Sequence, residues 1–267
     1  MYRLGCNIPG TVFWGGGKIA RTNKYDELKK AHDYLLKCGF DYVETPLGNV
    51  MAMSENDVGK AADELTLRAV NGFLPKKLYS NYKELVSYAE KAFKRMNKLG
   101  IETAVFGSGK YRKITFEFMR KKRMAILTDY LRTIGDFAYE NGVTITIEPL
   151  NRKETNVFNT VGETCEFVRE LNHPAVVSLA DIYHMGLVGE DLSVIEKEKD
   201  FIKHIHVSEK NRAMPGQPGK GEESYLKDFF NIINALPYDN KISVEADLKD
   251  LGKQGPMSFA TLNAFRK

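Results

Sequence analysis

Two kinds of hydrophobic pattern alternate along the chain. Short runs rich in β-branched residues, such as 144–148, are typical of strands, whereas longer segments with apolar residues three and four positions apart, such as 82–99, are typical of amphipathic helices. Gly39 and Gly100 end two of the helical segments, and Pro46 closes a strand. The pattern predicts strands at residues 3–8, 42–45, 67–70, 103–106, 144–148, 176–181, 204–206 and 242–245. It predicts helices at residues 25–37, 82–99, within 115–140, and at 163–171, 192–197, 225–236 and 256–265.

The order of these segments predicts the fold class. Strands that alternate with helices form a parallel sheet, because each connection returns the chain to the same edge. Eight strand–helix units most economically close into a single (β/α)8 barrel, a TIM barrel, rather than an open doubly wound sheet. No linker rich in proline, glycine or serine divides the chain, and 267 residues with 43% hydrophobic composition suit one such barrel. We therefore expect one α/β domain over residues 1–267.

Composition and charge restrict the partners of this domain. The net charge of +4 is small, and basic and acidic residues are interspersed, which argues against nucleic acid as a partner and favours a small polar substrate. The chain starts without a long apolar segment and contains no apolar run of the roughly 18 residues that span a membrane. Its three cysteines, Cys6, Cys38 and Cys165, form no CxxC pair, which suits reduced, buried thiols. We expect a soluble, cytoplasmic protein without a membrane partner.

Ionisable side chains stand at the ends of four predicted strands, namely Glu148, Asp181, His206 and Glu245. Barrel enzymes carry their chemistry at the C-terminal ends of their strands, so this repeated placement predicts a catalytic centre. Alternate residues of a strand face opposite sides of the sheet. The alternation places Glu148, His206 and Glu245 on a polar, inward face, but it is less decisive for Asp181, which shares its face with two apolar residues.

The quartet predicts a site for one divalent metal ion. Three carboxylates and one imidazole make a hard ligand set that suits Mn²⁺, our preferred ion, or Mg²⁺, and tolerates Co²⁺ or Zn²⁺. With roughly six positions on the metal, about two are left for a substrate with adjacent hydroxyl and carbonyl oxygens. Such a metal lowers the cost of removing the neighbouring carbon-bound proton to form an enediolate. Glu148 and Glu245, roughly 135° apart in an eight-stranded ring, are the candidate catalytic acid/base pair.

At these residues the chain resembles the sugar isomerase and epimerase superfamily built on the xylose-isomerase-like barrel, and most of all its D-tagatose and D-psicose 3-epimerase branch. The segments that carry the resemblance are 148–154, 181–185, 206–212 and 244–245. The resemblance implies metal binding by Glu148, Asp181, His206 and Glu245, and binding of substrate oxygens by Glu154, His184 and Arg212. It also implies a small carbohydrate or sugar-phosphate substrate and a homodimer or homotetramer. Residues 106–112 depart from the pattern of epimerases that act on free ketohexoses.

Several further residues have both a functional and a structural interpretation. Glu44 ends the second predicted strand and could bind substrate or form a structural ion pair. His204 points inward but lies two residues deeper than the metal-binding candidate of its strand, which favours core packing. Lys110 or Arg112 could hold a sugar phosphate if the loop after the fourth strand reaches the barrel mouth. The basic run 120–123 is expected to be a solvated helix face.

The function that we predict is metal-dependent ketose 3-epimerisation through a cis-enediolate. An aldose–ketose isomerase of the hydroxypyruvate type and an inosose dehydratase are alternatives, because both begin with proton abstraction beside a carbonyl. A nuclease resembling endonuclease IV would need a histidine-rich three-zinc site, but only five histidines occur, and His32 and His173 are expected at the surface. A non-catalytic sugar-binding barrel would not need both Glu148 and Glu245 as bases.

Overall fold

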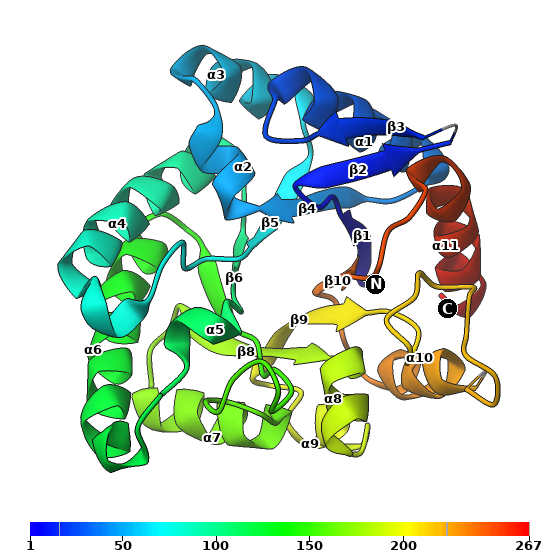
Figure 1. Cartoon of the computed structure of the whole chain (residues 1–267). Helices are drawn as coiled ribbons and strands as arrows, with labels where there is room; N and C mark the ends of the chain where they lie inside the picture. The colour runs from blue at the N-terminus through cyan, green and yellow to red at the C-terminus, as the bar shows by residue number, and fades with distance from the viewer. Residues whose placement is uncertain (16, 223, 267) are drawn as a thin grey trace.

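The computed structural model describes residues 1–15, 17–222 and 224–266, so positions 16, 223 and 267 of the predicted domain lie outside the described residues. Eight parallel strands close into a barrel at its centre (Figure 1). In chain order they are β1 (Arg3–Asn7), β4 (Tyr42–Pro46), β5 (Leu67–Asn71), β6 (Thr103–Phe106), β7 (Thr144–Ile147), β8 (Val176–Asp181), β9 (Ile202–Val207) and β10 (Lys241–Val244). Each strand pairs with the next along the chain, and β10 pairs with β1 to close the ring. The predicted TIM barrel is therefore confirmed.

Helices surround the barrel and pack their apolar faces against it (Figure 1). The long ones are α1 (Tyr25–Cys38), α3 (Glu55–Glu64), α4 (Tyr82–Lys98), α6 (Arg120–Glu140), α7 (Val161–Leu171), α10 (Tyr225–Ala235) and α11 (Leu251–Phe265). Shorter ones are α2 (Leu47–Ala52), α5 (Gly109–Arg112), α8 (Ile182–Val188) and α9 (Val194–Lys197), with 3-10 turns at Leu78–Ser80 and Glu117–Met119. The sequence pattern predicted α1, α4, α6, α7, α9, α10 and α11, but it missed α2, α3, α5 and α8. The apolar period behind these predictions reflects burial, as in α4, whose buried residues recur at helical spacing: Leu85, Ala89, Ala92, Phe93 and Met96.

The sequence pattern missed a hairpin that precedes the first helix. Strands β2 (Thr11–Trp14) and β3 (Lys18–Arg21) pair antiparallel and lie beside α1 and α11 at the upper right of Figure 1. Within its two strands only Val12 and Ala20 are buried, so they carry little of the apolar alternation by which a strand is recognised. Trp14, which packs edge-on against Tyr34 of α1, fixes the hairpin to the outside of the barrel.

The expectation that His32 and His173 lie at the surface is wrong for His32. This side chain is buried in α1, on the same face as Leu28 and Leu35. Its Nε2 accepts the backbone N–H of Thr66 at 2.8 Å, which satisfies a polar group inside an apolar face. The imidazole of His173 is about 10% exposed and faces Asp136.

All three cysteines are unpaired thiols, with Cys6 and Cys165 buried and Cys38 partly exposed. Burial raises the pKa of the Cys165 thiol to about 12, so this group stays protonated at neutral pH. Within the described ranges, no helix combines the length and apolar character that a membrane crossing needs.

Arg112 ties the C-terminal ends of two barrel strands together, which corrects its interpretation as a sugar-phosphate ligand. Its guanidinium is fully buried and donates to the carbonyl oxygens of Phe106 at 2.6 Å and Glu148 at 2.5 Å. The rings of Phe106 and Phe158 lie 5.8 Å and 5.7 Å from its central carbon. Burial lowers the pKa of Arg112 to about 10, so the group remains charged at neutral pH.

We predict that Arg112→Met lowers the free energy of unfolding by about 2–5 kcal/mol, because two buried carbonyl oxygens lose charged donors. Urea denaturation followed by circular dichroism measures this. Lys121→Met, at an exposed position of α6, is the matched control and should change stability by less than about 0.5 kcal/mol. A loss below about 1 kcal/mol in Arg112→Met would contradict the structural role.

Candidate metal centre and active site

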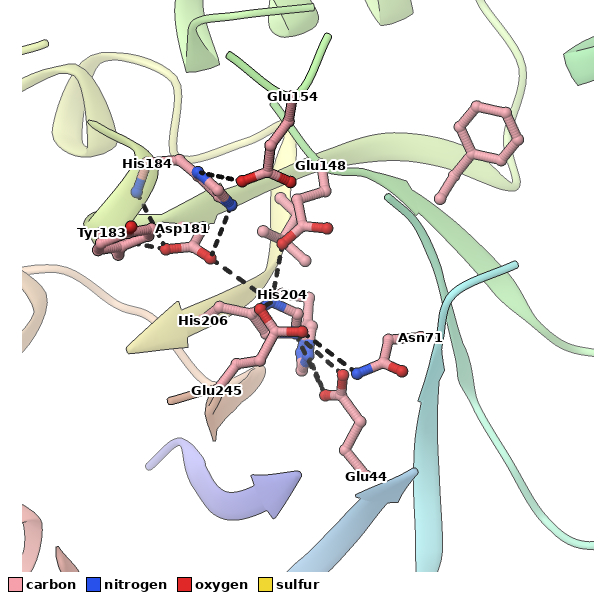
Figure 2. A network of polar contacts seen from close by, with 12 residues as sticks. Glu44, Asn71, Glu148, Glu154, Asp181, Tyr183, His184, His204, His206 and Glu245 are labelled. Carbon is pink, nitrogen blue, oxygen red and sulfur yellow. Dashed lines mark hydrogen bonds and ion pairs between the residues drawn. The ribbon is translucent and has the colours of Figure 1, made fainter. Parts of the chain in front are cut away.

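The four ionisable residues at the strand ends converge on one point at the mouth of the barrel. Glu148 follows β7, Asp181 ends β8, His206 lies in β9 and Glu245 follows β10. One ligand atom from each lies within 4.8 Å of the others, and Figure 2 shows the side chains turned toward one another. Four consecutive strands of the ring therefore supply one potential ligand each.

Strand register explains why the four side chains share a side of the sheet. Asp181 of β8 lies opposite His206 of β9, and two residues earlier Leu179 lies opposite His204. Residues two apart in a strand face the same side, so these two pairs both face the lumen. The apolar Leu179 is thus a lumen residue, which resolves the ambiguity that the alternation left for Asp181. Glu245 extends the ladder by donating its backbone N–H to the carbonyl of Val207 at 3.0 Å.

Asp181 has a second function in the backbone. Its Oδ1 accepts the N–H groups of Tyr183 at 2.8 Å and His184 at 3.3 Å, and so caps the N-terminus of α8 directly after the strand. Only Oδ2 is then turned toward the centre. The cap fixes the carboxylate orientation without help from the other candidate ligands.

The nitrogen Nδ1 of His206 lies at the middle of the group. It is 3.1 Å from Glu148 Oε1, 3.4 Å from Glu245 Oε2 and 4.0 Å from Asp181 Oδ2. Burial, and then the negative charge of Glu245, raise the pKa of Glu148. Burial also acts to raise the pKa of Glu245, but the positive charges of His206 and Arg212 outweigh it and hold that pKa at about 2. Three carboxylate oxygens and one nitrogen lie close enough to bind one metal ion. The three carboxylates repel one another, and a hard divalent cation between them would relieve that repulsion.

Glu44, a predicted substrate ligand, is not among the residues that line the cavity above the quartet. It is fully buried beneath the quartet, where its carboxylate faces both histidines of β9 (Figure 2). Its carboxylate lies 3.1 Å from His206 Nε2 and 3.0 Å from His204 Nε2. Burial acts to raise the pKa of Glu44, but the two imidazoles hold it well below its usual range. The ionised Glu44 holds one proton of His206 on Nε2, so a metal ion at Nδ1 would displace only the proton on that nitrogen.

His204 fills the deeper lumen position, as expected, and its contact with Glu44 makes it part of the support of the site. Burial lowers the pKa of His204 to about 4, so the ring is neutral at neutral pH. Its Nε2–H donates to Glu44, whereas its Nδ1 has no hydrogen-bond partner among the described residues.

A cavity of about 580 Å³ opens above the quartet, within the usual size range of ligand sites. Two of the four candidate metal ligands, Glu148 and Glu245, line it. The three predicted substrate ligands, Glu154, His184 and Arg212, line it as well. The structure therefore brings the predicted catalytic pair and the predicted substrate ligands to one cavity.

Arg212 bridges two of the carboxylates from the loop after β9. It donates to Asp181 Oδ2 at 3.0 Å and to Glu245 Oε2 at 2.6 Å. Its backbone adopts a left-handed φ of 65°, held by bonds to Glu209 and Asp247. Burial acts to lower the pKa of Arg212, but the neighbouring carboxylates raise it, so the guanidinium stays charged.

Sequence reasoning missed two asparagines that position these groups. Asn151 donates its side-chain amide to Glu154 Oε1 at 2.7 Å, and its backbone N–H donates to His184 Nδ1 at 3.3 Å. This contact leaves the proton of His184 on Nε2. Asn71, at the end of β5, donates to Glu245 Oε1 at 3.3 Å. The strand-end rule that found the quartet would also have found Asn71, because the signal is a polar residue closing an apolar run.

Comparison with known proteins supplies a family. A sequence model described as a xylose isomerase-like TIM barrel matches residues 33–260. A ketose 3-epimerase from Arthrobacter globiformis is 25% identical over 252 residues, which cover 91% of this chain and 83% of that protein. A 3-dehydro-D-guloside 4-epimerase from Escherichia coli (strain K12) is 27% identical over 116 residues, 43% of this chain and 42% of its own. A crystal structure of D-allulose 3-epimerase from Methylomonas sp. has the same fold, with a TM-score of 0.79 at 18% identity, covering 99% of this chain and 98% of that one.

We predict that Glu44→Gln weakens Mn²⁺ binding by about 10–100-fold, because the amide would turn an N–H group toward an imidazole N–H. Isothermal titration calorimetry of the metal-free protein measures the dissociation constant. The control is Glu117→Gln, because the carboxylate of Glu117 is exposed and belongs neither to the quartet nor to the contacts of Glu44. This variant should bind Mn²⁺ as the unmodified protein does. Unchanged affinity in a folded Glu44→Gln protein would remove the supporting role.

A second prediction concerns Gly107, which follows β6. A Cβ at this position would overlap Glu148 Oε2, so Gly107→Ala should displace that carboxylate and weaken Mn²⁺ binding by about 10-fold or more. Gly59→Ala in α3 is the matched control, because a Cβ there meets no other atom. The control should keep its metal affinity and gain about 0.5–1 kcal/mol of stability. Equal affinities in the two variants would show that Glu148 is not constrained here.

Proposed function

We propose that this chain, which belongs to the xylose isomerase-like TIM barrel family, is a metal-dependent sugar epimerase and most specifically a ketose 3-epimerase. A relative that bears this name aligns over nearly the whole chain. The predicted quartet and the cavity above it offer the metal ligands and the space that this reaction needs. The proposed substrate is a small carbohydrate with a carbonyl next to the inverted carbon.

The observation that carries the proposal is the pair Glu148 and Glu245 on a single cavity. Strands β8 and β9 separate β7 from β10 in the ring, so the two carboxylates approach the cavity from different directions. Inversion of a stereocentre requires removal of a proton from one face of a carbon and its return to the other face. We assign these two steps to Glu148 and Glu245, with a cis-enediolate of the sugar between them.

The quartet Glu148, Asp181, His206 and Glu245 would hold one divalent cation, for which Mn²⁺ is the proposed ion. When bound, the cation would polarise the substrate carbonyl and stabilise the negative charge that develops beside it. The hydrogen bond from His206 Nε2 to Glu44 keeps the imidazole oriented for this task.

Three further residues are assigned to substrate oxygens. Arg212 uses two of the five N–H donors of a guanidinium on Asp181 and Glu245, so further donors can face the cavity. His184 can donate through Nε2, and the half-exposed Glu154 can accept from a sugar hydroxyl. A homodimer or homotetramer and a cytoplasmic location stay predictions.

Competing reactions differ in the step after proton abstraction. An aldose–ketose isomerase returns the proton to the neighbouring carbon, and a dehydratase expels hydroxide. The relative named 3-dehydro-D-guloside 4-epimerase points to one more alternative, inversion of C4 beside a carbonyl at C3. The endonuclease IV alternative has less support, because the candidate metal groups among the described residues contain only two histidines, His204 and His206.

We predict that the Mn²⁺-loaded protein exchanges the proton on C3 of a ketose with deuterium in D₂O and forms the 3-epimer, which proton NMR detects. Glu245→Gln and Glu148→Gln should each lower the exchange rate by at least about 100-fold, because each removes one base. The labelled carbon and the product separate 3-epimerisation from 4-epimerisation and from isomerisation.

Asp181→Asn is the matched control, because it removes a candidate ligand but no assigned base. All variants are compared with measured stoichiometric Mn²⁺, so a lost metal is distinguished from a lost base. Exchange at the unmodified rate by metal-loaded Glu245→Gln would remove its assigned role.

A further inference from the structure

A second cavity adjoins the active-site cavity. It has a volume of about 630 Å³ and lies among the turn Leu78–Ser80, helix α5, the loop after it and the start of α6. Lys110 and Lys113 line both cavities, so the two share a wall or an opening at these side chains. The lining of the second cavity also includes Tyr79, Tyr111 and Asn156. A ligand bound over the quartet would therefore meet the same two lysines that face the second cavity.

The charges around the second cavity have one sign. Among the described residues, no carboxylate lines it, and four cationic side chains do: Lys77, Lys110, Lys113 and Arg123. None of the four forms an ion pair with a carboxylate in the described part of the chain, whereas neighbouring cations do. Lys76 pairs with Glu84, and Arg120 pairs with Glu117. A cleft whose charged lining residues are all cations raises the local concentration of anions.

The expectation of a solvated basic face at 120–123 holds only in part. Lys121 and Lys122 are exposed, but Arg123 turns its guanidinium over the ring of Tyr79, 4.6 Å from the ring centre. The phenolic hydroxyl of Tyr79 in turn donates to the carbonyl of Arg112 at 2.8 Å. Arg123 is therefore held beside the cavity by an ordered contact instead of extending into solvent.

The loop that carries Lys113 is also fixed. Asn156 accepts the N–H of Ile114 at 2.9 Å and donates to the carbonyl of the same residue at 2.9 Å. This reciprocal pair holds the backbone on both sides of Ile114, where Lys113 and Thr115 face the cavity. The backbone from which Lys113 extends is therefore ordered before a ligand binds, which lowers the entropic cost of binding.

We propose that the second cavity binds an anionic group, a phosphate ester or a carboxylate, on the same sugar whose carbonyl end lies over the quartet. The inference rests on the proposed function and narrows its substrate class to a sugar phosphate or a sugar acid. Anionic oxygens accept hydrogen bonds from Lys and Arg that are stronger than those to a neutral hydroxyl. Arg112 contributes none of these contacts, because its guanidinium is used on backbone carbonyls.

The test compares deuterium exchange and epimerisation of D-fructose, D-fructose 1-phosphate, D-fructose 6-phosphate and D-fructuronate by the Mn²⁺-loaded protein. We expect kcat/KM for at least one anionic sugar to exceed that for D-fructose by about 100-fold or more. The phosphate and carboxylate substrates distinguish the two sources of negative charge. Lys77→Gln and Arg123→Gln, which line only the second cavity, should each lower this preference about 10-fold. Lys121→Gln is the control and should keep the preference.

Binding of inorganic phosphate, followed by phosphorus NMR, separates the failure of this inference from the failure of the proposed function. Exchange with D-fructose at the rate of the anionic sugars, with an unchanged ratio in Arg123→Gln, would overturn the anion site and leave the epimerase. Phosphate binding that weakens in Arg123→Gln, without exchange of any sugar, would support the anion site and remove the epimerase. Absence of both would overturn both.

Discussion

Three carboxylates around one imidazole, two of them buried and Glu245 partly so, are the constraint on which the mouth of the barrel depends. Like charges at this distance repel strongly where water is excluded, so each carboxylate needs a donor or a positive charge beside it. Asp181 and Glu245 receive these from separate elements, namely the guanidinium of Arg212, the N-terminus of α8 and the amide of Asn71, whereas Glu148 faces Nδ1 of His206. The loops and short helices above the barrel are arranged around this electrostatic demand, which a divalent cation would also satisfy.

The barrel itself could be predicted because its physical basis is local. Each strand needs a short apolar run and each helix an apolar face, and both periods are visible in the sequence. The quartet could be predicted for the same reason. Parallel strands in register bring their C-terminal ends to one end of the barrel, so residues at these ends in the sequence are neighbours in the ring. Hairpin β2–β3 was not, because it packs on the outside of a finished barrel and needs only two buried side chains.

Roles that depend on distant partners were beyond sequence reasoning. Glu44 and His204 meet across 160 positions, so nothing near Glu44 shows that imidazoles will surround it. Arg112 and Lys110 lie two residues apart in a single helical turn, yet one is sealed among backbone carbonyls and the other lines two cavities. Arg112 is drawn inward by backbone carbonyl oxygens at the ends of β6 and β7. Every residue has such an oxygen, so the sequence does not show which ones are free to accept a hydrogen bond.

The bridge formed by Glu44 between His204 and His206 also bears on how this barrel can evolve. A change at any one of these three positions leaves a buried charge or donor without its partner, and such losses are costly in a dry interior. Replacing one of the three residues alone therefore costs stability or metal affinity, which a change of an exposed residue does not. We therefore expect related sequences either to keep all three residues or to replace them together, so that substitutions at these positions are correlated.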